Sequence, residues 1–228
     1  MRVSLLLLAL LAAAMLANAD PFQNGSFEVG PAAPVNLCGP CGGAPYIGTF
    51  FAPYTGITGW TVTSGSVDII FPPGWTASDG LRSIDLDGLS AGTITQQFDT
   101  TPGTTYEVDF DLAANFYAGA TIKHVLVTAP GFSQPYSFDS TGKTALDMGW
   151  ETHTFEFVAA GSSSTLSFAD TDASSAFGPA LDNVRVSAVE APPVPEPSTW
   201  LLAGTGIVLS IVITRKRFRS QKRLPARS

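Results

Sequence analysis

Basic side chains are scarce over most of this 228-residue chain. Between Asp20 and Thr199 there are 19 acidic residues and only four basic ones, so this segment has a formal net charge of −15. A segment with this charge repels the phosphates of nucleic acids and anionic lipid headgroups. We therefore expect no nucleic-acid partner.

The sequence signatures of common hydrolases are also missing. The chain has no Gly-x-Ser-x-Gly nucleophile elbow and no His-Glu-x-x-His zinc-binding helix. Its two histidines, His124 and His153, fall in strand-like segments, where a packed imidazole is commoner than a catalytic base. Asp109 and Asp111 would lie about 7 Å apart on one strand face, a separation that an inverting glycosidase could use. Because solvated strand faces carry such pairs routinely, we expect a protein that is not an enzyme, and glycan cleavage is the alternative.

Only two cysteines occur, Cys38 and Cys41, in the sequence Cys-Gly-Pro-Cys. This spacing is typical of redox-active sites, but a thioredoxin-like site needs a strand before it and a helix after it. Gly42, Gly43 and Pro45 follow the pair, which indicates a loop. In an oxidising compartment we expect a small-ring disulfide that staples this loop, and a redox or metal-binding role is the alternative.

Two stretches of the chain lack charge altogether and are apolar. The first, residues 5–16, follows Arg2 and precedes the small residues 17–19, which a signal peptidase accepts. We therefore predict that residues 1–19 are a signal peptide cleaved after Ala19. The alternative is an uncleaved anchor, although twelve apolar residues are too few to span a bilayer.

The second uncharged stretch, residues 198–214, is 17 residues long, the lower limit for a helix that crosses about 30 Å of hydrocarbon. We predict a transmembrane helix here, with Trp200 at one membrane interface. The basic tail that follows, residues 215–228, begins with Arg215, Lys216 and Arg217. The positive-inside rule keeps this tail in the cytoplasm, so the acidic segment faces away from the cytoplasm, in agreement with the signal peptide.

A proline-rich linker, residues 191–199, precedes the predicted helix and contains Pro195, Glu196 and Pro197. The order of a Pro-Glu-Pro motif, an apolar helix and an arginine-rich end resembles the PEP-CTERM sorting tail of exported bacterial proteins. The resemblance implies an exosortase-type membrane protease as partner, in Gram-negative bacteria that make exopolysaccharide. It also implies an inner-membrane-tethered precursor with a periplasmic ectodomain, which then moves to the cell envelope, surface or extracellular matrix. An ordinary membrane anchor on a proline-stiffened stalk is the alternative.

Residues 20–190 are rich in glycine, threonine, serine and aromatics, and apolar side chains recur with period two rather than with helical spacing. The clearest strand, residues 106–112, alternates four apolar residues with three carboxylates, which predicts one core face and one wet face. Seven further strands are predicted at residues 66–71, 81–87, 93–98, 121–128, 152–158, 165–168 and 181–186. We therefore predict a single all-β domain, a jelly-roll β-sandwich.

Several short motifs within residues 20–190 resemble the choice-of-anchor C family. They are Asn24-Gly25-Ser26-Phe27-Glu28, Gly59-Trp60, Gly65-Ser66-Val67-Asp68, Asp79-Gly80, Ser83-Ile84-Asp85-Leu86 and Gly178-Pro179-Ala180-Leu181-Asp182-Asn183-Val184. The resemblance implies a galactose-binding-like β-sandwich, similar to those of plant cell-wall proteins and carbohydrate-binding modules. Residues 31–53, rich in glycine and proline, fit the pattern least and look like an insertion.

Galactose-binding-like modules often join their terminal strands with a calcium ion, and Glu28 and Asp182 match those places. Asp182 shares strand parity with Val184 and Val186, so its carboxylate leans toward the core, where it needs a cation or hydrogen-bond donors. Structural calcium is therefore expected at Glu28 and Asp182. The alternative is that Asp182 caps a turn through backbone N–H groups. Residues 85–88 and 170–172 look like fragments of calcium loops but lack the spacing of an EF-hand.

Sugar binding would use aromatic rings that stack on pyranose rings beside a few polar groups. The aromatic residues on expected loops are Tyr54, Trp75, Phe116, Tyr117 and Trp150. Trp60 follows a glycine among threonines and is assigned to the core. We therefore expect an exported, non-enzymatic surface or matrix protein that binds exopolysaccharide. The alternative is a structural matrix protein that binds other proteins and no glycan.

Overall fold

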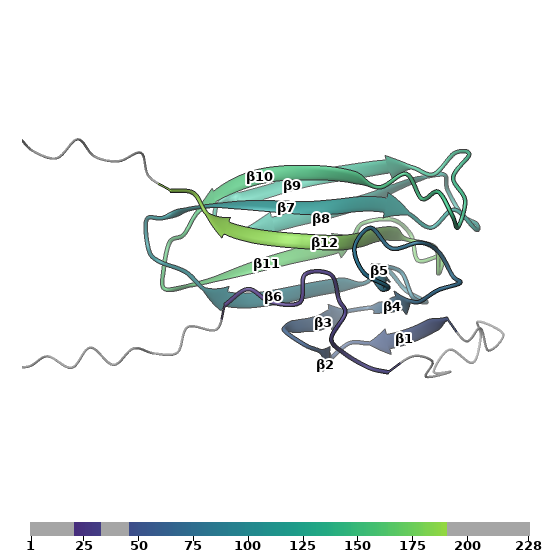
Figure 1. Cartoon of the computed structure of the whole chain (residues 1–228), viewed down its shortest axis with the longest axis horizontal. Coiled ribbons are helices and arrows are strands. Elements are labelled where there is room, and N and C mark those ends of the chain that lie inside the picture. The colour runs from purple at the N-terminus through teal and green to yellow at the C-terminus, as the bar shows by residue number, and fades with distance from the viewer. Residues whose placement is uncertain (1–20, 33–45, 191–228) are drawn as a thin grey trace, which may run out of the picture. The chain divides into compact units, whose positions relative to one another are not determined.

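The computed structural model describes residues 21–32 and 46–190 (Figure 1). The predicted signal peptide, the Cys38–Cys41 pair, the Pro195-Glu196-Pro197 motif, the predicted transmembrane helix with Trp200, and the basic residues from Arg215 to Arg217 lie outside the described residues. In the two described ranges, no helix is long and apolar enough to cross a membrane.

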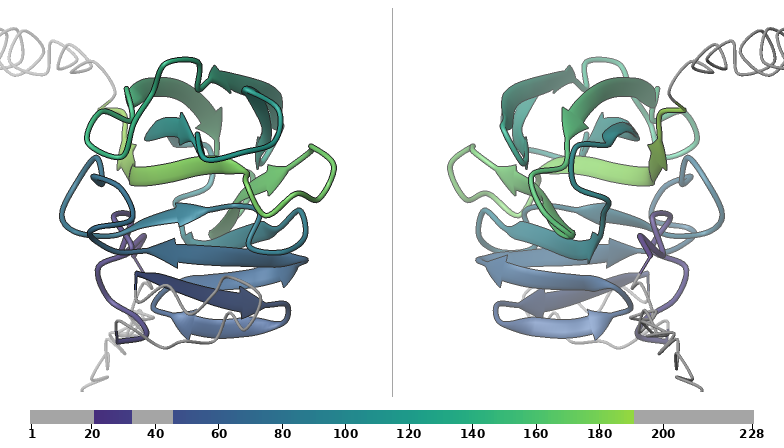
Figure 2. Two further views of the ribbon diagram at one scale, coloured as in Figure 1. Left: turned by 90° about the vertical axis from the view of Figure 1, so that its right-hand side faces the viewer. Right: turned by 90° about the vertical axis from the view of Figure 1, so that its left-hand side faces the viewer.

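The described residues form twelve strands in two six-stranded sheets, and every strand pairing is antiparallel. In spatial order, sheet A consists of β1 (Ile47–Phe51), β4 (Ser66–Ile70), β5 (Ser83–Asp85), β12 (Pro179–Ala188), β7 (Thr105–Ala114) and β10 (Glu151–Val158). Sheet B consists of β2 (Tyr54–Ile57), β3 (Trp60–Ser64), β6 (Thr93–Asp99), β11 (Ser163–Asp170), β8 (Ile122–Ala129) and β9 (Phe132–Asp139). Figures 1 and 2 show the strands of both sheets running side by side, and the prediction of an all-β sandwich is confirmed.

The alternation of apolar residues builds the core between the sheets. On β7, the side chains of Val108, Phe110 and Leu112 are fully buried in the core. Phe110 contacts Phe168 of β11 edge-to-face, with ring centroids 5.2 Å apart, which joins sheet A to sheet B. Trp60 is also buried, as its sequence context predicts.

All eight segments predicted as strands contain a strand, but β1, β2, β3 and β9 were not predicted. The interpretation of residues 31–53 as an insertion is wrong for its last part, because β1 forms the edge of sheet A and pairs with β4 over its whole length. Tyr54, expected on a loop, begins β2.

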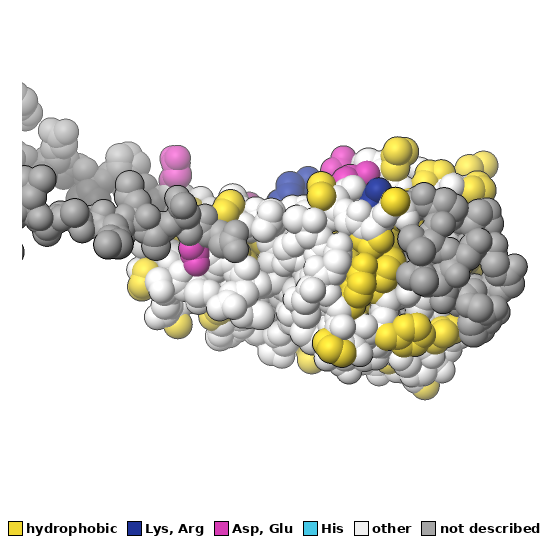
Figure 3. Space-filling model, turned by 90° about the horizontal axis from the view of Figure 1, so that it is seen from below, with side chains coloured by type: hydrophobic (Ala, Val, Ile, Leu, Met, Phe, Trp, Pro, Cys, Tyr) yellow, Lys and Arg dark blue, Asp and Glu magenta, His cyan; other side chains and the backbone are white. Residues whose placement is uncertain are grey.

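The segment between β4 and β5 reaches the outer face of sheet A, the face turned away from sheet B, where Ser78 and Asp79 bind Asp111 and Asp182. Asp68, Asp85, Asp111 and Asp182 all lie on strands of this sheet, and all four are buried. The predicted wet face of β7 is therefore wrong at Asp111, although Asp109 remains partly exposed. Figure 3 shows one side of the molecule, where few charged side chains are seen and hydrophobic side chains gather toward one end.

Candidate functional site

A cavity of about 510 Å³ lies over the outer face of sheet A at β1 and β4. On β4, Val67 and Ile69 point into the core, so alternation turns Asp68 and Ile70 toward the opposite face. Ile47 of β1 pairs with Ile70, and both line the cavity. The described lining residues are Tyr46, Ile47, Asp68, Ile70, Gly74, Trp75, Leu89, Asn115, Tyr117, Ala176 and Phe177. Its volume falls within the range of small-molecule sites.

Two of the predicted sugar-binding aromatics, Trp75 and Tyr117, form part of the cavity wall. Trp75 is 3% exposed, and its indole N–H donates a hydrogen bond to Ser83 Oγ at 2.7 Å. Tyr117 is 52% exposed, and its O–H donates to the carbonyl oxygen of Gly74 at 3.1 Å. A Cβ atom at Gly74 would approach Ile70 Cγ2 to 2.6 Å, so this close passage of the loop requires glycine. Both aromatic rings are therefore held in place by hydrogen bonds.

The other three predicted aromatics do not line the cavity in the described part of the chain. Phe116 packs against Tyr117, with ring centroids 4.4 Å apart, and is partly buried against the core. Tyr54 stacks on Phe50 at 4.5 Å. Trp150 donates its indole N–H to the carbonyl oxygen of Thr76 at 3.0 Å, which anchors the loop that follows β4.

Two aromatic residues of the wall, Tyr46 and Phe177, were not predicted. Tyr46 lies in the stretch interpreted as an insertion, immediately before β1. Phe177 directly precedes the Gly-Pro-Ala-Leu-Asp-Asn-Val motif, which was the one sequence signal near it.

Asp68 is the carboxylate among the described lining residues. It is 4% exposed, and its Oδ1 atom is buried without a hydrogen-bond partner among the described residues. Burial raises the pKa of Asp68 to about 6. The charge of Asp87 raises it further, while the Thr49 hydroxyl opposite on β1 lowers it without making a hydrogen bond of regular geometry.

Three more carboxylates are buried: Asp85 on β5, Asp87 on the loop after β5, and Asp170 on β11 of sheet B. Asp85 accepts hydrogen bonds from the backbone N–H groups of Asp87 and Gly178, both at 2.9 Å, and from Asn115 Nδ2 at 2.7 Å. Burial, followed by the charge of Asp68, raises the pKa of Asp85 well above its ordinary value. Asp87 Oδ1 and Asp170 Oδ2 are buried without partners in the described ranges, and burial raises the pKa of Asp170 to about 6.

The predicted calcium ligands, Glu28 and Asp182, both bind the backbone of residues 78–82. Glu28 Oε1 accepts the N–H groups of Leu81 and Arg82, each at 2.7 Å. Asp182 Oδ2 accepts those of Ser78 at 2.7 Å and Asp79 at 2.9 Å, and its Oδ1 accepts that of Asn183 at 2.7 Å.

These contacts favour the capping alternative over calcium. Burial raises the pKa of Asp182 to about 7, and both of its oxygens face N–H donors. Within the described ranges there is also no cluster of three or more His, Cys, Asp or Glu side chains suited to a metal ion. Asp182 therefore does not fit a calcium ligand as it is placed here.

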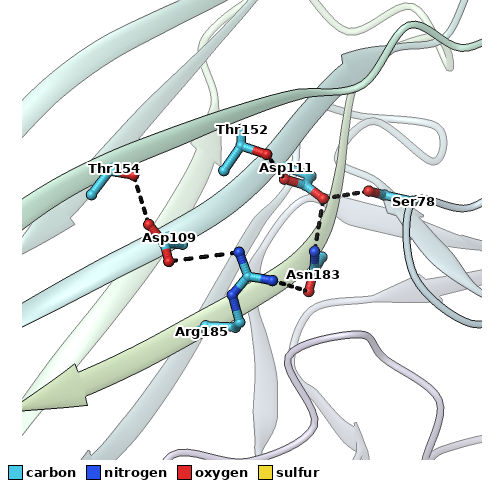
Figure 4. A network of polar contacts seen from close by, with 7 residues as sticks. All are labelled: Ser78, Asp109, Asp111, Thr152, Thr154, Asn183 and Arg185. Carbon is cyan, nitrogen blue, oxygen red and sulfur yellow. Dashed lines mark hydrogen bonds and ion pairs between the residues drawn. The ribbon is translucent and has the colours of Figure 1, made fainter.

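The pair considered for glycan cleavage, Asp109 and Asp111, belongs to a network of polar contacts (Figure 4). Asp111 accepts hydrogen bonds from Thr152 Oγ1 at 2.6 Å, from Asn183 Nδ2 at 2.9 Å and from Ser78 Oγ. Asp109 accepts one from Thr154 Oγ1 at 2.6 Å and lies 3.6 Å from Arg185 Nη2.

The same network disfavours Asp111 as an acid. Burial raises the pKa of Asp111, but the hydrogen bonds from Ser78, Thr152 and Asn183 outweigh burial and leave the pKa below its ordinary value. A general acid of a glycosidase needs a raised pKa, so this carboxylate lacks the property that the reaction requires.

Neither histidine is among the described residues that line the cavity. His124 Nδ1 lies 2.7 Å from Asp172 Oδ1 on the surface. His153 stacks on Phe110, with ring centroids 5.4 Å apart. Both lie on strands, but only His153 packs against the core, because His124 on β8 is exposed.

Comparison with known proteins shows the family of this domain. The family model described as "Protein of unknown function (DUF642)" matches residues 20–187. The chain belongs to the DUF642 family. A second model, the PEP-CTERM protein-sorting motif, matches residues 193–217 after the DUF642 domain. The predicted sorting tail is thereby confirmed, and the motif implies an exported, surface-sorted protein that an exosortase processes.

The DUF642 domain also resembles part of a curated protein. Halomucin of Haloquadratum walsbyi (strain DSM 16790 / HBSQ001) is 32% identical over 166 residues, which cover 72% of this chain. The match spans 2% of the length of halomucin, so it concerns one segment of a much longer protein.

Among solved structures, several carbohydrate-binding modules are similar to this chain. CBM35 from Paenibacillus barcinonensis matches with a TM-score of 0.38 and 20% identity, covering 62% of this chain and 99% of that chain. A CBM4 structure matches at 0.38 and 21% identity, covering 73% and 99%. TmCBM61, solved in complex with beta-1,4-galactotriose, matches at 0.41 and 12% identity, covering 75% and 99%. At these identities the likeness concerns the fold alone.

Proposed function

We propose that this protein is a non-enzymatic, surface-exposed carbohydrate-binding protein, and that its DUF642 domain binds exopolysaccharide in the cavity over β1 and β4. The observation that carries the proposal is the pair of fixed aromatic rings, Trp75 and Tyr117, on the wall of a cavity that also contains Asp68. The resemblance of the sequence motifs to the choice-of-anchor C family, with its galactose-binding-like modules, agrees with this function. The expected membrane tether and cytoplasmic tail would hold the precursor until the exosortase acts.

The chemistry of the wall suits a sugar. A pyranose ring has apolar C–H faces that stack on aromatic rings, and its hydroxyl groups need hydrogen-bond partners at the rim. Tyr117 presents a half-exposed ring whose O–H is held by Gly74, so the side chain loses little rotamer freedom when a ligand stacks on it. Asp68 supplies a hydrogen-bond acceptor beside it.

The absence of enzyme activity is part of the proposal. Glycoside hydrolysis generally uses two carboxyl groups across the scissile bond, whereas Asp68 is the single carboxylate among the described lining residues. Asp109 and Asp111 are engaged in the network of Figure 4. Release of reducing ends from any polysaccharide by the purified protein, lost on Asp68→Asn, would show an enzyme instead.

The test is a glycan array and polysaccharide retention assay with the purified protein and two matched variants. Tyr117→Ala removes a ring from the cavity wall, and Phe51→Ala removes an equally exposed ring, 52% exposed, that does not belong to the described lining. We expect Tyr117→Ala to weaken retention at least tenfold and Phe51→Ala to leave it unchanged. A blank array, or equal losses in the two variants, contradicts binding in this cavity.

The alternative, a matrix protein that binds other proteins, is favoured by a different observation. A groove of about 280 Å³, whose described lining includes Pro72, Pro73, Leu81 and Leu146, presents Leu146 at 89% exposure. Exposed apolar grooves are typical of protein contacts. Light scattering over a range of concentrations tests this function: oligomers that disappear on Leu146→Ser support it, and a monomer at all concentrations argues against it.

A further inference from the structure

The cavity contains a buried carboxylate, Asp68, with no cation beside it among the described lining residues. Asp68 is 4% exposed, its Oδ1 has no hydrogen-bond partner among the described residues, and no basic side chain is among the described lining residues. A buried charge is strongly unfavourable unless it is paired or hydrogen-bonded. This carboxylate is therefore the group in the wall that a ligand can satisfy.

The titratable neighbours of Asp68 are acidic rather than basic. The charge of Asp87 acts on Asp68, and the charge of Asp68 acts on Asp85. Both neighbours are buried. Thr49, the cross-strand neighbour on β1, is neutral. The ligand site thus has carboxylates behind it, on β5 and on the loop after β5.

The basic groups on neighbouring segments are engaged elsewhere. The Arg82 guanidinium lies 4.9 Å from the centre of the Phe71 ring and donates a hydrogen bond to the carbonyl oxygen of Pro31. Lys123 Nζ donates to the carbonyl oxygen of Ala118 and acts on Asp170. Neither side chain is among the described lining residues.

A neutral hydroxyl group could donate a hydrogen bond to Asp68, but it would leave the buried charge uncompensated. An ammonium group donates hydrogen bonds to the carboxylate and also neutralises its charge, which a hydroxyl group does not do. The aromatic rings of the same wall attract a cation through their faces. Both features favour a ligand that carries an ammonium group on a sugar-sized body.

We infer that the cavity selects sugar residues with a free, protonated amine, such as the residues of a de-N-acetylated hexosamine polymer, over neutral or N-acetylated sugars. The ammonium group binds Asp68, and the ring lies against Tyr117. The inference rests on the proposed function, because it assigns a ligand class to the same cavity.

The experiment compares the glucosamine tetramer with the N-acetylglucosamine tetramer by calorimetry, using the full protein at neutral pH. We expect the amine-bearing tetramer to bind at least tenfold more tightly. Asp68→Asn should reduce that preference to less than twofold. Glu156→Gln, which removes an exposed carboxylate on β10, should retain it, because a preference caused by overall negative charge would fall equally in both variants.

The outcomes separate the inference from the proposed function. Equal affinity of the wild-type protein for the two tetramers, or tighter binding of the acetylated one, overturns the inference while glycan binding stands. Failure of both tetramers and of the whole glycan array overturns the proposed function. Circular dichroism shows whether Asp68→Asn folds. If this variant misfolds, the comparison of the two tetramers on the wild-type protein still tests the inference.

Discussion

Tyr117 donates its phenolic O–H to the carbonyl oxygen of Gly74 at 3.1 Å, which joins the loop after β7 to the loop after β4 beside the cavity. The two residues are 43 positions apart in the chain. The bond holds the most exposed aromatic ring of the described lining in one orientation, so it prepares the wall for a stacked ligand.

Tyr117→Phe therefore separates the ring from its hydrogen bond. The phenylalanine keeps the stacking surface but is no longer held by Gly74, so we expect glycan affinity to fall about fivefold, because one hydrogen bond contributes about 1 kcal/mol. Calorimetry of Tyr117→Phe beside Tyr117→Ala measures the difference. Equal losses in the two variants would show that the ring itself contributes nothing to binding, which contradicts stacking of the ligand on Tyr117.

Asp182→Ala should destabilise the domain through the loop that it caps. The N–H groups of Ser78 and Asp79 lose their acceptor, and we expect the free energy of unfolding to fall by about 1 to 3 kcal/mol. Urea denaturation of this variant against Glu156→Ala, an exposed residue on β10, provides the measurement.

The wild-type protein and Asp182→Ala also test the calcium prediction. If Asp182 only caps the loop, calcium and a chelator give the same Tm for the wild-type protein. A calcium-dependent rise in Tm that is lost in Asp182→Ala would instead restore the calcium site.

The buried carboxylates make stability depend on pH. The folded-state pKa values of Asp68 and Asp170 are raised to about 6, and that of Asp182 to about 7, so between about pH 4 and 7 the folded protein holds protons that the unfolded chain has lost. These groups favour folding most at low pH, and their contribution is lost as pH rises through 6 to 7. The lowered pKa of Asp111 acts in the opposite direction, but only at more acidic pH. We expect the Tm to rise when pH is lowered from 8 to 5, measured by calorimetry.

Asp68→Asn isolates one of these groups. It removes a buried charge that has no matching cation, so at pH 8 it should stabilise the protein by about 1 to 3 kcal/mol, and the difference from wild type should vanish near pH 4. The same variant should lose the preference for amine-bearing sugars. Lower stability of Asp68→Asn at pH 8 would mean that Asp68 is satisfied by a group that we have not identified.

The sorting tail gives a prediction in cells. Glu196→Ala changes the centre of the Pro-Glu-Pro motif within the matched residues 193–217, and we expect the variant to accumulate in the membrane fraction as the uncleaved precursor. Ser228→Ala, outside the matched residues, is the control. Normal release of the Glu196→Ala variant would contradict a role for the Pro-Glu-Pro motif in sorting.

The fold was predictable where local alternation is strong, and it was missed where sequence signals conflict. Residues 106–112 alternate cleanly and form the middle of β7. β9 contains Pro135, which argues against a strand, but β9 lies at the edge of sheet B, where a missing N–H is tolerated. β1 follows a stretch rich in glycine and proline, which concealed it.

The site was predictable only in part. Trp75 and Tyr117 were candidates because aromatic rings on loops suit sugars, and both line the cavity. Strand parity indicates which face a side chain occupies but not which loop covers that face. For this reason the burial of Asp68 and Asp111 under distant loops could not be read from residues 66–71 and 106–112.

The most direct test of the account is the affinity of the wild-type protein and of Tyr117→Ala for an amine-bearing polysaccharide, with Phe51→Ala as control. Glycan binding in the cavity over β1 and β4 predicts measurable affinity that Tyr117→Ala reduces at least tenfold and Phe51→Ala does not change. Binding that survives Tyr117→Ala undiminished would contradict the assignment of the cavity over β1 and β4 as the glycan site.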